Sequence, residues 1–474
     1  MDDWEPKQRQ YAHFDAPLSK REMRRIAKTP SLVASHQFFP FLKFDDEWQP
    51  FRRKKGKVAP KPDRKVRTIR YASRRDAAVF SYYRWLLAGR YEQKLAESGL
   101  ASSVLAYRRV VGLTGGGKSN INFAHEAFCA IQDYDGCAVV ALDISKFFES
   151  LDHARLAQVW AWLLGTPKLP PDHAHVFKNI TRYADVSRDE AYVRLGHAKW
   201  ENVGSGRYLK ILSNPIPLRL ATMSEFREKI IGRNSTFKSM IQRHEDEFGV
   251  PQGAPLSDLL ANAYLFEFDE KMQAYVQARG GRYFRYSDDI LIVLPGADKP
   301  IAQDAEAFAQ AEIKNIGQEL RIKETKTSAY IYRRETVGHS FSHLKGKGAN
   351  GLEYLGFRFD GRFAHVRSST LSRLHRNITF AARAVAHNHV ARYPGKTLGE
   401  LVDLFDIGAF MQKFGRVREF SAGGDPEDWT FWTYAQRSRT VFEKMGAPIE
   451  KQLSRYRKFT AKRVGVEIRS ALGL

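Results

Sequence analysis

The chain has 474 residues, of which 43% are hydrophobic, so it can form two or three domains with buried cores. It carries 76 Lys and Arg against 53 Asp and Glu, a formal charge of +23, which predicts a polyanionic partner. Nucleic acid is the first candidate, and an anionic membrane surface is the alternative. No apolar stretch reaches the ~20 residues of a membrane span, and the polar start predicts no signal peptide. Two cysteines, Cys129 and Cys137, exclude a disulfide framework and a Cys-rich zinc module, so we expect a cytoplasmic protein.

Two composition features mark the N-terminal region, which we expect to span residues 1–63. An aromatic cluster, HQFFPFLKF, occupies 36–44. A basic run then extends from Arg52 to Arg67, with nine Lys or Arg residues and one Asp. Such a run is either a solvated linker or a contact strip for backbone phosphates, and the sequence leaves both interpretations open.

Strand and helix patterns alternate through the central part of the chain. A helix is predicted over Ala77–Leu95, and 138–142 is a short β-branched apolar run typical of a buried strand. Residues 155–245 are turn-rich, with five prolines, and yield no assignment. A long helix is predicted from Ser257, its expected N-cap. We then expect a hairpin over 282–294, a helix near 302–320, a strand near 328–333 and a strand pair over 352–359. This interleaving predicts an α/β or α+β fold.

The pattern becomes helical after about residue 365. Apolar residues recur at helical spacing, at Leu371, Leu374, Ile378, Ala381 and Val385. The opposite face of this predicted helix carries three arginines, Arg373, Arg376 and Arg383. A second basic helix is predicted over 450–470. We expect these basic faces to clamp a nucleic-acid duplex, chiefly through its phosphates.

Three carboxylates stand at the ends of apolar segments. Asp143 ends the run AVVALD, while Asp288 and Asp289 lie between the two apolar halves of RYFRYSDDILIVL. Adjacent carboxylates at a hairpin tip are unfavourable unless positive charge lies beside them. Such a set can hold two Mg²⁺ ions roughly 3.5–4 Å apart for phosphoryl transfer. The alternatives are a helix cap or turn residue for Asp143 and a solvated hairpin tip for the pair.

Four segments occur in one order: ALDISKFFESLDH (141–153), GVPQGAPLSDLLANAYL (249–265), YSDD (286–289) and LEYLGF (352–357). Each is weak alone, but together they resemble the palm of reverse transcriptases. The similarity covers roughly 64–360. It is greatest to the bacterial branch that includes group II intron, retron and defence-associated enzymes. The resemblance implies an α+β, right-hand polymerase with fingers at 64–137, a palm at 138–360 and a helical thumb at 361–474. The segment 155–245 would be an insertion or part of the fingers.

The resemblance also implies roles for individual residues. Asp143 and Asp288 would be the principal metal ligands, with Asp289 in a weaker or indirect role and Ile144 in the same metal-binding set. One Mg²⁺ would lower the pKa of the primer 3′-hydroxyl, and the other would bind the triphosphate and stabilise pyrophosphate. Mn²⁺ is an alternative ion. Lys326 is the match for the residue that protonates pyrophosphate, with Lys323 as a competitor.

Substrate contacts follow from the same resemblance. Phe148 occupies the steric-gate position, which favours dNTPs over rNTPs, whereas Phe147 is expected in the core. Gln252 and Gly253 would meet the incoming nucleotide, because glycine allows a close backbone approach. Leu355 and Gly356 would grip the primer. Further contacts to triphosphate or template are expected from four basic residues, with salt-bridged surface residues as the alternative: Lys65, Arg67, Arg75 and Arg108. Asp258 departs from the proline that intron enzymes usually have after the serine.

Two rival interpretations come from other classes. GLTGGGKS (112–119) matches the phosphate-binding P-loop pattern, with Lys118 as its lysine, and AVVALD could serve as the second strand of a P-loop ATPase. In the polymerase interpretation this loop is a mobile fingers turn whose Lys118 meets phosphates. The other rival is a catalytically silent RNA-binding protein on a polymerase fold. We expect an RNA-directed DNA polymerase that uses a structured non-coding RNA template, a primer and dNTPs in defence against phage, with a partner protein or a second copy as further partners.

Overall fold

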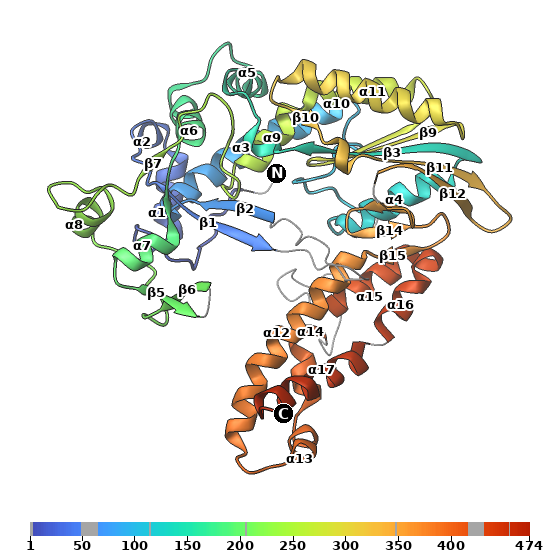
Figure 1. Ribbon diagram of the computed structural model, residues 1–474. Helices are drawn as coiled ribbons and strands as arrows, with labels where there is room; N and C mark the ends of the chain where they lie inside the picture. The colour runs from blue at the N-terminus through green and yellow to red at the C-terminus, as the bar shows by residue number, and fades with distance from the viewer. Residues whose placement is uncertain are drawn as a thin grey trace.

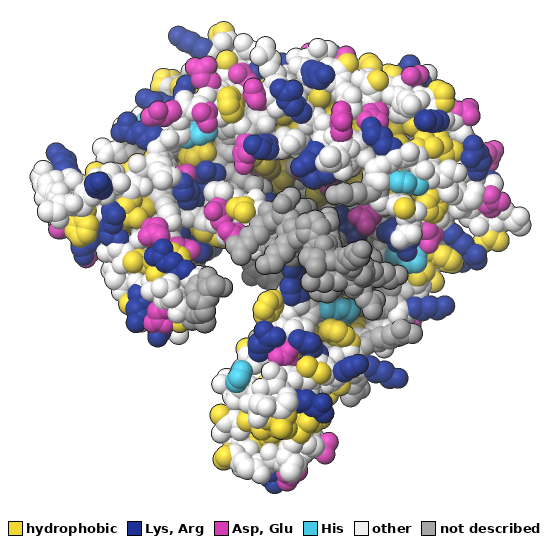
Figure 2. Space-filling model, viewed as in Figure 1, with side chains coloured by type: hydrophobic (Ala, Val, Ile, Leu, Met, Phe, Trp, Pro, Cys, Tyr) yellow, Lys and Arg dark blue, Asp and Glu magenta, His cyan; other side chains and the backbone are white. Residues whose placement is uncertain are grey.

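The computed structural model describes residues 3–48, 65–112, 115–203, 206–346, 348–415, 431–454 and 456–474. Figure 1 shows a lobe that combines the N-terminal segment with the segment around α6–α8, a central lobe around the largest sheet, and a C-terminal helical lobe. The surface is hollowed between the N-terminal lobe and the C-terminal helices (Figure 2). The candidate site lies on the central sheet, so that sheet is described first.

The central sheet has the order β12-β11-β3-β9-β8, with β10 also paired to β3. All of its pairings are antiparallel. Its strands are β3 (Gly136–Ser145), β8 (Arg282–Tyr286), β9 (Asp289–Pro295), β10 (Arg321–Ile322), β11 (Ser328–Arg334) and β12 (His339–Lys345). The strands predicted near 138–142, 282–294 and 328–333 are therefore confirmed.

Both faces of the central sheet are covered, which explains why β3 and β9 are nearly continuous apolar runs. Val140 and Ile292 belong to the core shared with four helices, α3 (Arg74–Glu97), α9 (Ser257–Tyr264), α10 (Phe266–Gln277) and α11 (Lys299–Ile316). Val139 and Val293 face the other way, toward α4 (Asn120–Gln132) and a three-stranded sheet. That small sheet consists of β13 (Leu352–Tyr354), β14 (Phe357–Phe359) and β15 (Ala364–Val366). Side-chain alternation along each strand thus fills two cores at once.

The N-terminal lobe is built around a second sheet, with the order β2-β1-β4-β7. Its strands are β1 (Phe41–Trp48), β2 (Lys65–Tyr71), β4 (Ala184–Ser187) and β7 (Gln242–Arg243). The surrounding helices are α1 (Lys20–Lys28), α2 (Pro30–Ala34), α6 (Pro171–Thr181), α7 (Arg188–Arg194) and α8 (Met223–Glu225), whereas α5 (His153–Leu164) packs on α3 and α9. A hairpin of β5 (Ala198–Val203) and β6 (Gly206–Ile211) completes the lobe. Residues 155–245, which had no assignment, therefore supply two strands to this sheet. Most of the predicted basic run lies outside the described residues.

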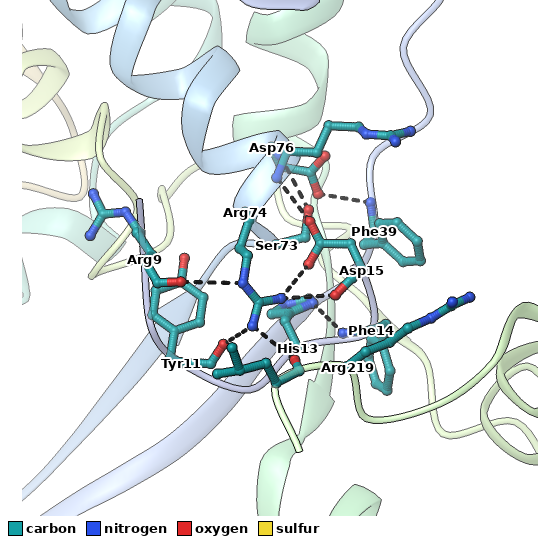
Figure 3. Close-up of polar contacts among 12 residues, drawn as sticks. Arg9, Tyr11, His13, Phe14, Asp15, Phe39, Ser73, Arg74, Asp76 and Arg219 are labelled. Atoms are coloured by element: carbon teal, nitrogen blue, oxygen red, sulfur yellow. Dashed lines mark hydrogen bonds and ion pairs between the residues drawn. The ribbon is translucent and has the colours of Figure 1, made fainter. Parts of the chain in front are cut away.

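A buried arginine ties distant segments of this lobe together (Figure 3). The Arg74 guanidinium is 2% exposed and pairs with Asp15 at 3.2 Å. It also donates to the backbone carbonyls of Arg9 (3.2 Å), Asp15 (2.8 Å) and Leu218 (2.8 Å), and to that of Tyr11. One side chain therefore joins the N-terminal segment, the start of α3 and the inserted segment, because arginine has several donors in a rigid planar array.

The C-terminal lobe is helical, as expected. Its helices are α12 (Ser368–Arg392), α13 (Leu398–Asp403), α14 (Ile407–Gly415), α15 (Phe431–Phe442), α16 (Ala447–Ser454) and α17 (Tyr456–Ala471). The face of α12 that is buried consists of Leu374, Ile378, Ala382 and Ala386. Val385 is 36% exposed, so its prediction as part of the apolar face was wrong. Throughout the described ranges, no helix combines the length and apolar composition needed to cross a membrane.

Two details around Ser257 differ from the prediction. The predicted long helix is interrupted at Leu265, where α9 ends and α10 begins. The N-cap position of α9 is Leu256, and Ser257 is the first helical residue. Its buried hydroxyl donates instead to the carbonyl of Pro251 at 2.8 Å, so the serine fastens the preceding loop to the helix.

Candidate active site

A tight turn at the end of the β8–β9 hairpin carries two of the predicted carboxylates. Tyr286 and Asp289 pair across the hairpin, which leaves Ser287 and Asp288 as a two-residue loop. Ser287 is buried and has φ of +60°, as the first position of a type II′ turn requires, although glycine usually occupies it. Its hydroxyl lies 3.1 Å from the hydroxyl of Tyr107. The turn is therefore a strained conformation held by its surroundings.

The central sheet brings the third carboxylate to this turn. Asp143 on β3 lies directly opposite Asp289 on β9. The next residue, Ile144, donates its backbone N–H to the carbonyl of Asp288 at 3.0 Å. Strands β3 and β9 are neighbours in the sheet although they are far apart in sequence. Their paired ends therefore bring the three carboxylates together at one end of the sheet.

Burial and repulsion between neighbouring carboxylates make Asp288 and Asp289 unusually basic. Burial raises the pKa of Asp289 to about 7, and repulsion from Asp288 and Asp143 adds to this effect. The pKa of Asp288 is also raised, mainly by burial and then by Asp143. Both shifts are opposed by Lys326, whose positive charge favours the ionised forms. The site therefore concentrates negative charge that needs a cation for balance.

Of the two predicted lysines, the structure places Lys326 in the site. Its ammonium lies 2.5 Å from both carboxylate oxygens of Asp143. It belongs to a short 3₁₀ helix, Glu324–Lys326, that follows β10. Lys323 contributes a backbone N–H to the carbonyl of Asp143 at 2.8 Å, while its side chain is exposed. Lys323 thus orients the strand end, and Lys326 provides the charge.

The donor set fits a hard divalent cation. Carboxylate oxygens are the ligands that Mg²⁺ prefers in proteins. In this structure the Lys326 ammonium contacts the Asp143 carboxylate, which shows that this carboxylate can bind a positively charged group. Within the described ranges, no group of three or more His, Cys, Asp or Glu side chains is arranged as a metal centre. The amide of Ile144 is committed to the turn, so this residue could contribute only its carbonyl to a metal.

The PQG segment lies against both the strand end of β3 and the N-terminal sheet. Val250 donates its backbone N–H to the carbonyl of Phe148 at 2.8 Å, and Arg70 donates its own to the carbonyl of Gln252 at 2.8 Å. Gly253 has φ of +109°, and a Cβ there would lie 2.7 Å from the carbonyl oxygen of Arg70. Glycine is therefore required where the loop meets β2.

The predicted nucleotide-contact residues lie on several elements. Phe147 is buried in the core, as predicted, whereas Phe148 is only partly buried and packs on that core. The side chains of Arg67 and Arg75 are exposed, and Lys65 begins β2. The N-terminal sheet and the end of β3 thus border the same loop.

Leu355 and Gly356, the residues of the predicted primer grip, form the turn between β13 and β14. Leu355 has φ of +46° and Gly356 of +93°, as a two-residue type I′ hairpin requires. Asn120, at the start of α4, donates to the carbonyl of Leu355 at 3.0 Å and to the hydroxyl of Tyr434 at 3.1 Å. Arg367 donates its backbone N–H to the carbonyl of Gly356 at 3.0 Å. The positive charge of Arg367 also opposes the raised pKa of Asp289, which links this turn to the carboxylates.

The glycine-rich loop does not have the setting of a P-loop. Gly112 donates to the carbonyl of Gly116 at 2.7 Å, Lys118 donates its backbone N–H to Val110 at 2.8 Å, and its ammonium pairs with Glu126 at 2.6 Å. A P-loop belongs to a parallel sheet, whereas β3 has antiparallel neighbours only. The loop leads into α4, which packs against the central sheet. Nothing in this arrangement favours the ATPase interpretation.

The predicted nucleic-acid arginines divide into two groups. The Arg108 guanidinium is 5% exposed, makes two bonds to Glu92 at 2.8 and 2.6 Å, and donates to Ala101 at 3.0 Å, so the structure favours the salt-bridged alternative there. On α12, Arg373 is exposed and Arg376 is partly exposed. Arg383 is exposed while pairing with Glu467 at 3.0 Å. The surface of this helix is therefore accessible and basic.

Several residues of the site were missed from the sequence. Tyr107, Arg367 and Asn120 contact the two turns but belong to no quoted motif as functional residues. Arg285 stands inside the quoted segment RYFRYSDD, and its charge within an apolar strand was the available signal. Asp269 on α10, which forms a buried ion pair with Arg285, had no signal, because nothing local in a helix predicts which strand residue it will meet.

Comparison with known proteins agrees with this geometry. Residues 215–359 match the family described as reverse transcriptase (RNA-dependent DNA polymerase). Over 96 residues the chain is 32% identical to the retron Ec86 reverse transcriptase of Escherichia coli. This match covers 20% of this chain and 29% of that protein. The matched part is thus less than a third of the relative's length.

Among solved structures, telomerase from Candida albicans in complex with a TWJ fragment of telomeric RNA shares 11% identity, covering 96% of this chain and 70% of that chain, with a TM-score of 0.39. Apo telomerase from Candida tropicalis shares 13% identity over 90% of this chain and 63% of that chain, with a TM-score of 0.38.

The family match and the observed topology together confirm the predicted α+β, right-hand polymerase fold. Figure 1 shows the sheet β2-β1-β4-β7, the sheet around β3 and the helices α12–α17 as three separate parts of this fold.

Proposed function

We propose that this protein is an RNA-directed DNA polymerase that adds dNTPs to a primer hydroxyl. The observation that carries the proposal is the meeting of Asp143, Asp288 and Asp289 on adjacent palm strands, with Lys326 at 2.5 Å from Asp143. The match to the reverse transcriptase family over 215–359 supports the same chemistry. The predicted boundaries between fingers, palm and thumb form part of this proposal.

The residues at the ends of β3 and β9 would bind the metal ions and supply a proton. Asp143, Asp288 and Asp289, with the carbonyl of Ile144, would hold divalent cations, Mg²⁺ first and Mn²⁺ as the alternative. When bound, these ions supply acidification of the primer hydroxyl and charge stabilisation of the leaving pyrophosphate. Lys326 carries a proton beside Asp143 and is placed to deliver it to the leaving group.

The other predicted residues bind and orient the substrates. Gln252 and Gly253 border the nucleotide on the fingers side, together with Lys65, Arg67 and Arg75. The Leu355–Gly356 turn holds the primer end against the carboxylates. The exposed face of α12 supports a duplex through Arg373, Arg376 and Arg383, which contact phosphates.

The position of Phe148 supports a preference for deoxynucleotides. Its backbone carbonyl is bonded to the PQG loop, and its ring is partly exposed beside the strand end that bears Asp143. Phe148→Ala is expected to raise rNTP incorporation relative to dNTP by about 10- to 100-fold, the scale at which a pocket rejects one additional group. The measurement is the ratio of the two kcat/KM values, with Phe147→Leu as the core control. An unchanged ratio would remove the gate role.

The template is proposed to be RNA, and the biological role to be defence against phage with a structured non-coding RNA. The charge of +23 and the similarity to a retron reverse transcriptase over 96 residues support the RNA partner. The defence role rests on resemblance to the bacterial branch. Plating of a broad phage panel on cells with the native locus and with its Asp288→Ala version tests it. Equal plating on both strains contradicts the role.

The decisive experiment measures incorporation of each labelled dNTP and rNTP by purified protein, with and without its co-purifying RNA. DNA synthesis that needs the RNA and disappears in Asp288→Ala supports the proposal, and sequencing of the product identifies the template. No incorporation, combined with ATP hydrolysis that is lost in Lys118→Ala, would instead support the P-loop interpretation. RNA binding without either activity would support the catalytically silent alternative.

A further inference from the structure

A fully buried arginine lies directly behind the catalytic turn. Arg285 on β8 and Asp269 on α10 both have 0% exposed side chains. The guanidinium Nε lies 2.6 Å from one carboxylate oxygen, and Nη2 lies 2.5 Å from the other. Tyr283 donates its hydroxyl to the same carboxylate at 2.7 Å. This bidentate arrangement fixes the plane of the guanidinium.

The third nitrogen of the guanidinium reaches the turn itself. Nη1 of Arg285 donates to the backbone carbonyl of Ser287 at 3.1 Å and to the side-chain carbonyl of Asn262 at 3.0 Å. Ser287 is the residue with φ of +60°, and the carbonyl that accepts this bond forms the peptide link to Asp288. A strained turn needs a partner that holds its carbonyl, and Arg285 is that partner.

The backbone of Arg285 is fixed as well. Its N–H donates to the carbonyl of Ser103 at 2.7 Å, and its carbonyl accepts the N–H of Leu105 at 2.9 Å. Asn262 in turn donates to the carbonyl of Ala106 at 2.7 Å. The guanidinium is thus anchored on α9, on α10 and on the segment before Tyr107.

Stability alone does not account for an ion pair at this place. Burying two charges is costly, and apolar residues of similar volume often give equal or greater stability. The pair has what an apolar contact lacks, a rigid donor directed at one backbone carbonyl. Its specific contribution is therefore the geometry of the turn.

We propose that Arg285, oriented by Asp269 and Asn262, is a positioning residue that sets the direction of Asp288 and Asp289 through the Ser287 carbonyl. The inference rests on the proposed polymerase function. It adds a requirement that the family match does not supply, namely that the three carboxylates converge only while this donor is present.

The first test compares wild type with Arg285→Met/Asp269→Leu, which replaces the ion pair by apolar side chains. The thermal midpoint and primer–template Kd are expected to remain near wild type. The kcat is expected to fall by about 100-fold, the scale of a small misplacement of reacting groups. The Mg²⁺ concentration for half-maximal rate should rise, since the carboxylates no longer converge. A purely structural pair would leave kcat and the Mg²⁺ requirement of the folded enzyme unchanged.

The second test is Arg285→Lys, which keeps one buried positive charge for Asp269 but lacks the fork that reaches Ser287. We expect it to fold and to show a lowered kcat with little change in KM. Asp15→Asn is the matched control, because it weakens the buried pair with Arg74 far from the turn in the chain; it should lower the thermal midpoint and leave kcat unchanged. Full kcat in Arg285→Lys, or in the folded apolar double variant, overturns the inference.

The wild-type enzyme separates this inference from the proposed function. If wild type and Asp288→Ala both lack incorporation, the polymerase proposal fails and Arg285 has no reaction to support. If wild type incorporates dNTPs and Asp288→Ala does not, the polymerase proposal stands, and the Arg285 variants decide the inference independently.

Discussion

Two buried arginines, Arg74 in the N-terminal lobe and Arg285 in the central sheet, make the same kinds of contact with different consequences. Each pairs with a buried aspartate and donates to backbone carbonyls. Arg74 collects carbonyls from segments that are distant in the chain, including Arg9 and Leu218, and so joins parts of one lobe (Figure 3). Arg285 reaches two residues further along the chain, to the turn that carries Asp288 and Asp289. A buried arginine–aspartate pair can thus either join distant segments of the chain or fix the conformation of one turn. Which of the two it does depends on the carbonyl groups that the remaining guanidinium donors contact.

The largest effect is expected at the carboxylates beside the turn that Arg285 contacts. Asp143→Ala should lower incorporation by at least about 10³-fold, the scale of losing one electrostatic stabiliser of a transition state. Thermal unfolding and RNA binding measured alongside should stay near wild type, because Asp143 lies at a strand end rather than in the core. If the variant instead unfolds, the carboxylate belongs with Arg74 as a structural residue, and the contrast between the two regions disappears.

The contacts of Arg74 in the N-terminal lobe should show their effect in stability. Arg74→Met leaves Asp15 buried without its partner and the carbonyls without their donor, so the free energy of unfolding should fall by about 3–5 kcal/mol. Urea denaturation followed by circular dichroism measures this change. The kcat of the folded fraction should remain near wild type. A lowered kcat with unchanged stability would contradict the assembly role.

The pH dependence of stability tests the charge balance at the turn. The pKa of Asp289 is raised from 3.8 to about 7 in the folded protein. The folded state therefore keeps a proton that the unfolded chain has lost, and this contribution to stability is present below 3.8 and is lost as pH rises through about 7. Without divalent cations, wild type should be less stable at about pH 8 than at about pH 5, relative to Asp289→Asn, by about 1–3 kcal/mol.

Urea midpoints of both proteins at the two pH values provide the measurement. Added Mg²⁺ should restore the stability of wild type at the higher pH more than that of Asp289→Asn, because a ligand stabilises the state that binds it. Parallel pH profiles for the two proteins would show that Asp289 is ionised at no cost, and the need for a cation would then lose its support.

The smallest effect is expected from an exposed arginine, which sharpens the contrast with the buried pair. Arg373→Ala should change the free energy of unfolding by no more than about 0.5 kcal/mol. It should reduce the slope of log Kd for primer–template against log salt by about 0.7–0.9, the value for one phosphate contact. Arg90→Ala, an exposed position on α3, is the control. Equal slopes for both variants would place the duplex away from α12.

Much of the fold and site could be predicted because the relevant patterns are local. The apolar run at 138–142 and the hairpin over 282–294 follow from residue type and alternation, which depend on burial on both faces of a strand. The order of Asp143, PQG, YSDD and LGF likewise required no knowledge of distant contacts. Ser257 and Val385 were misjudged because neighbouring loops and helices, not the local pattern, decided what their side chains contact.

By itself, the sequence determined the identity of the carboxylates, the positions of the strand ends that carry them and the excess of positive charge. Only the tertiary structure decided that Lys326 rather than Lys323 reaches Asp143, that 155–245 supplies two strands to the N-terminal sheet, and that Asp269 orients Arg285. Local patterns record which face of an element is apolar. The partner across that face depends on strand register and packing, which join residues far apart in the chain.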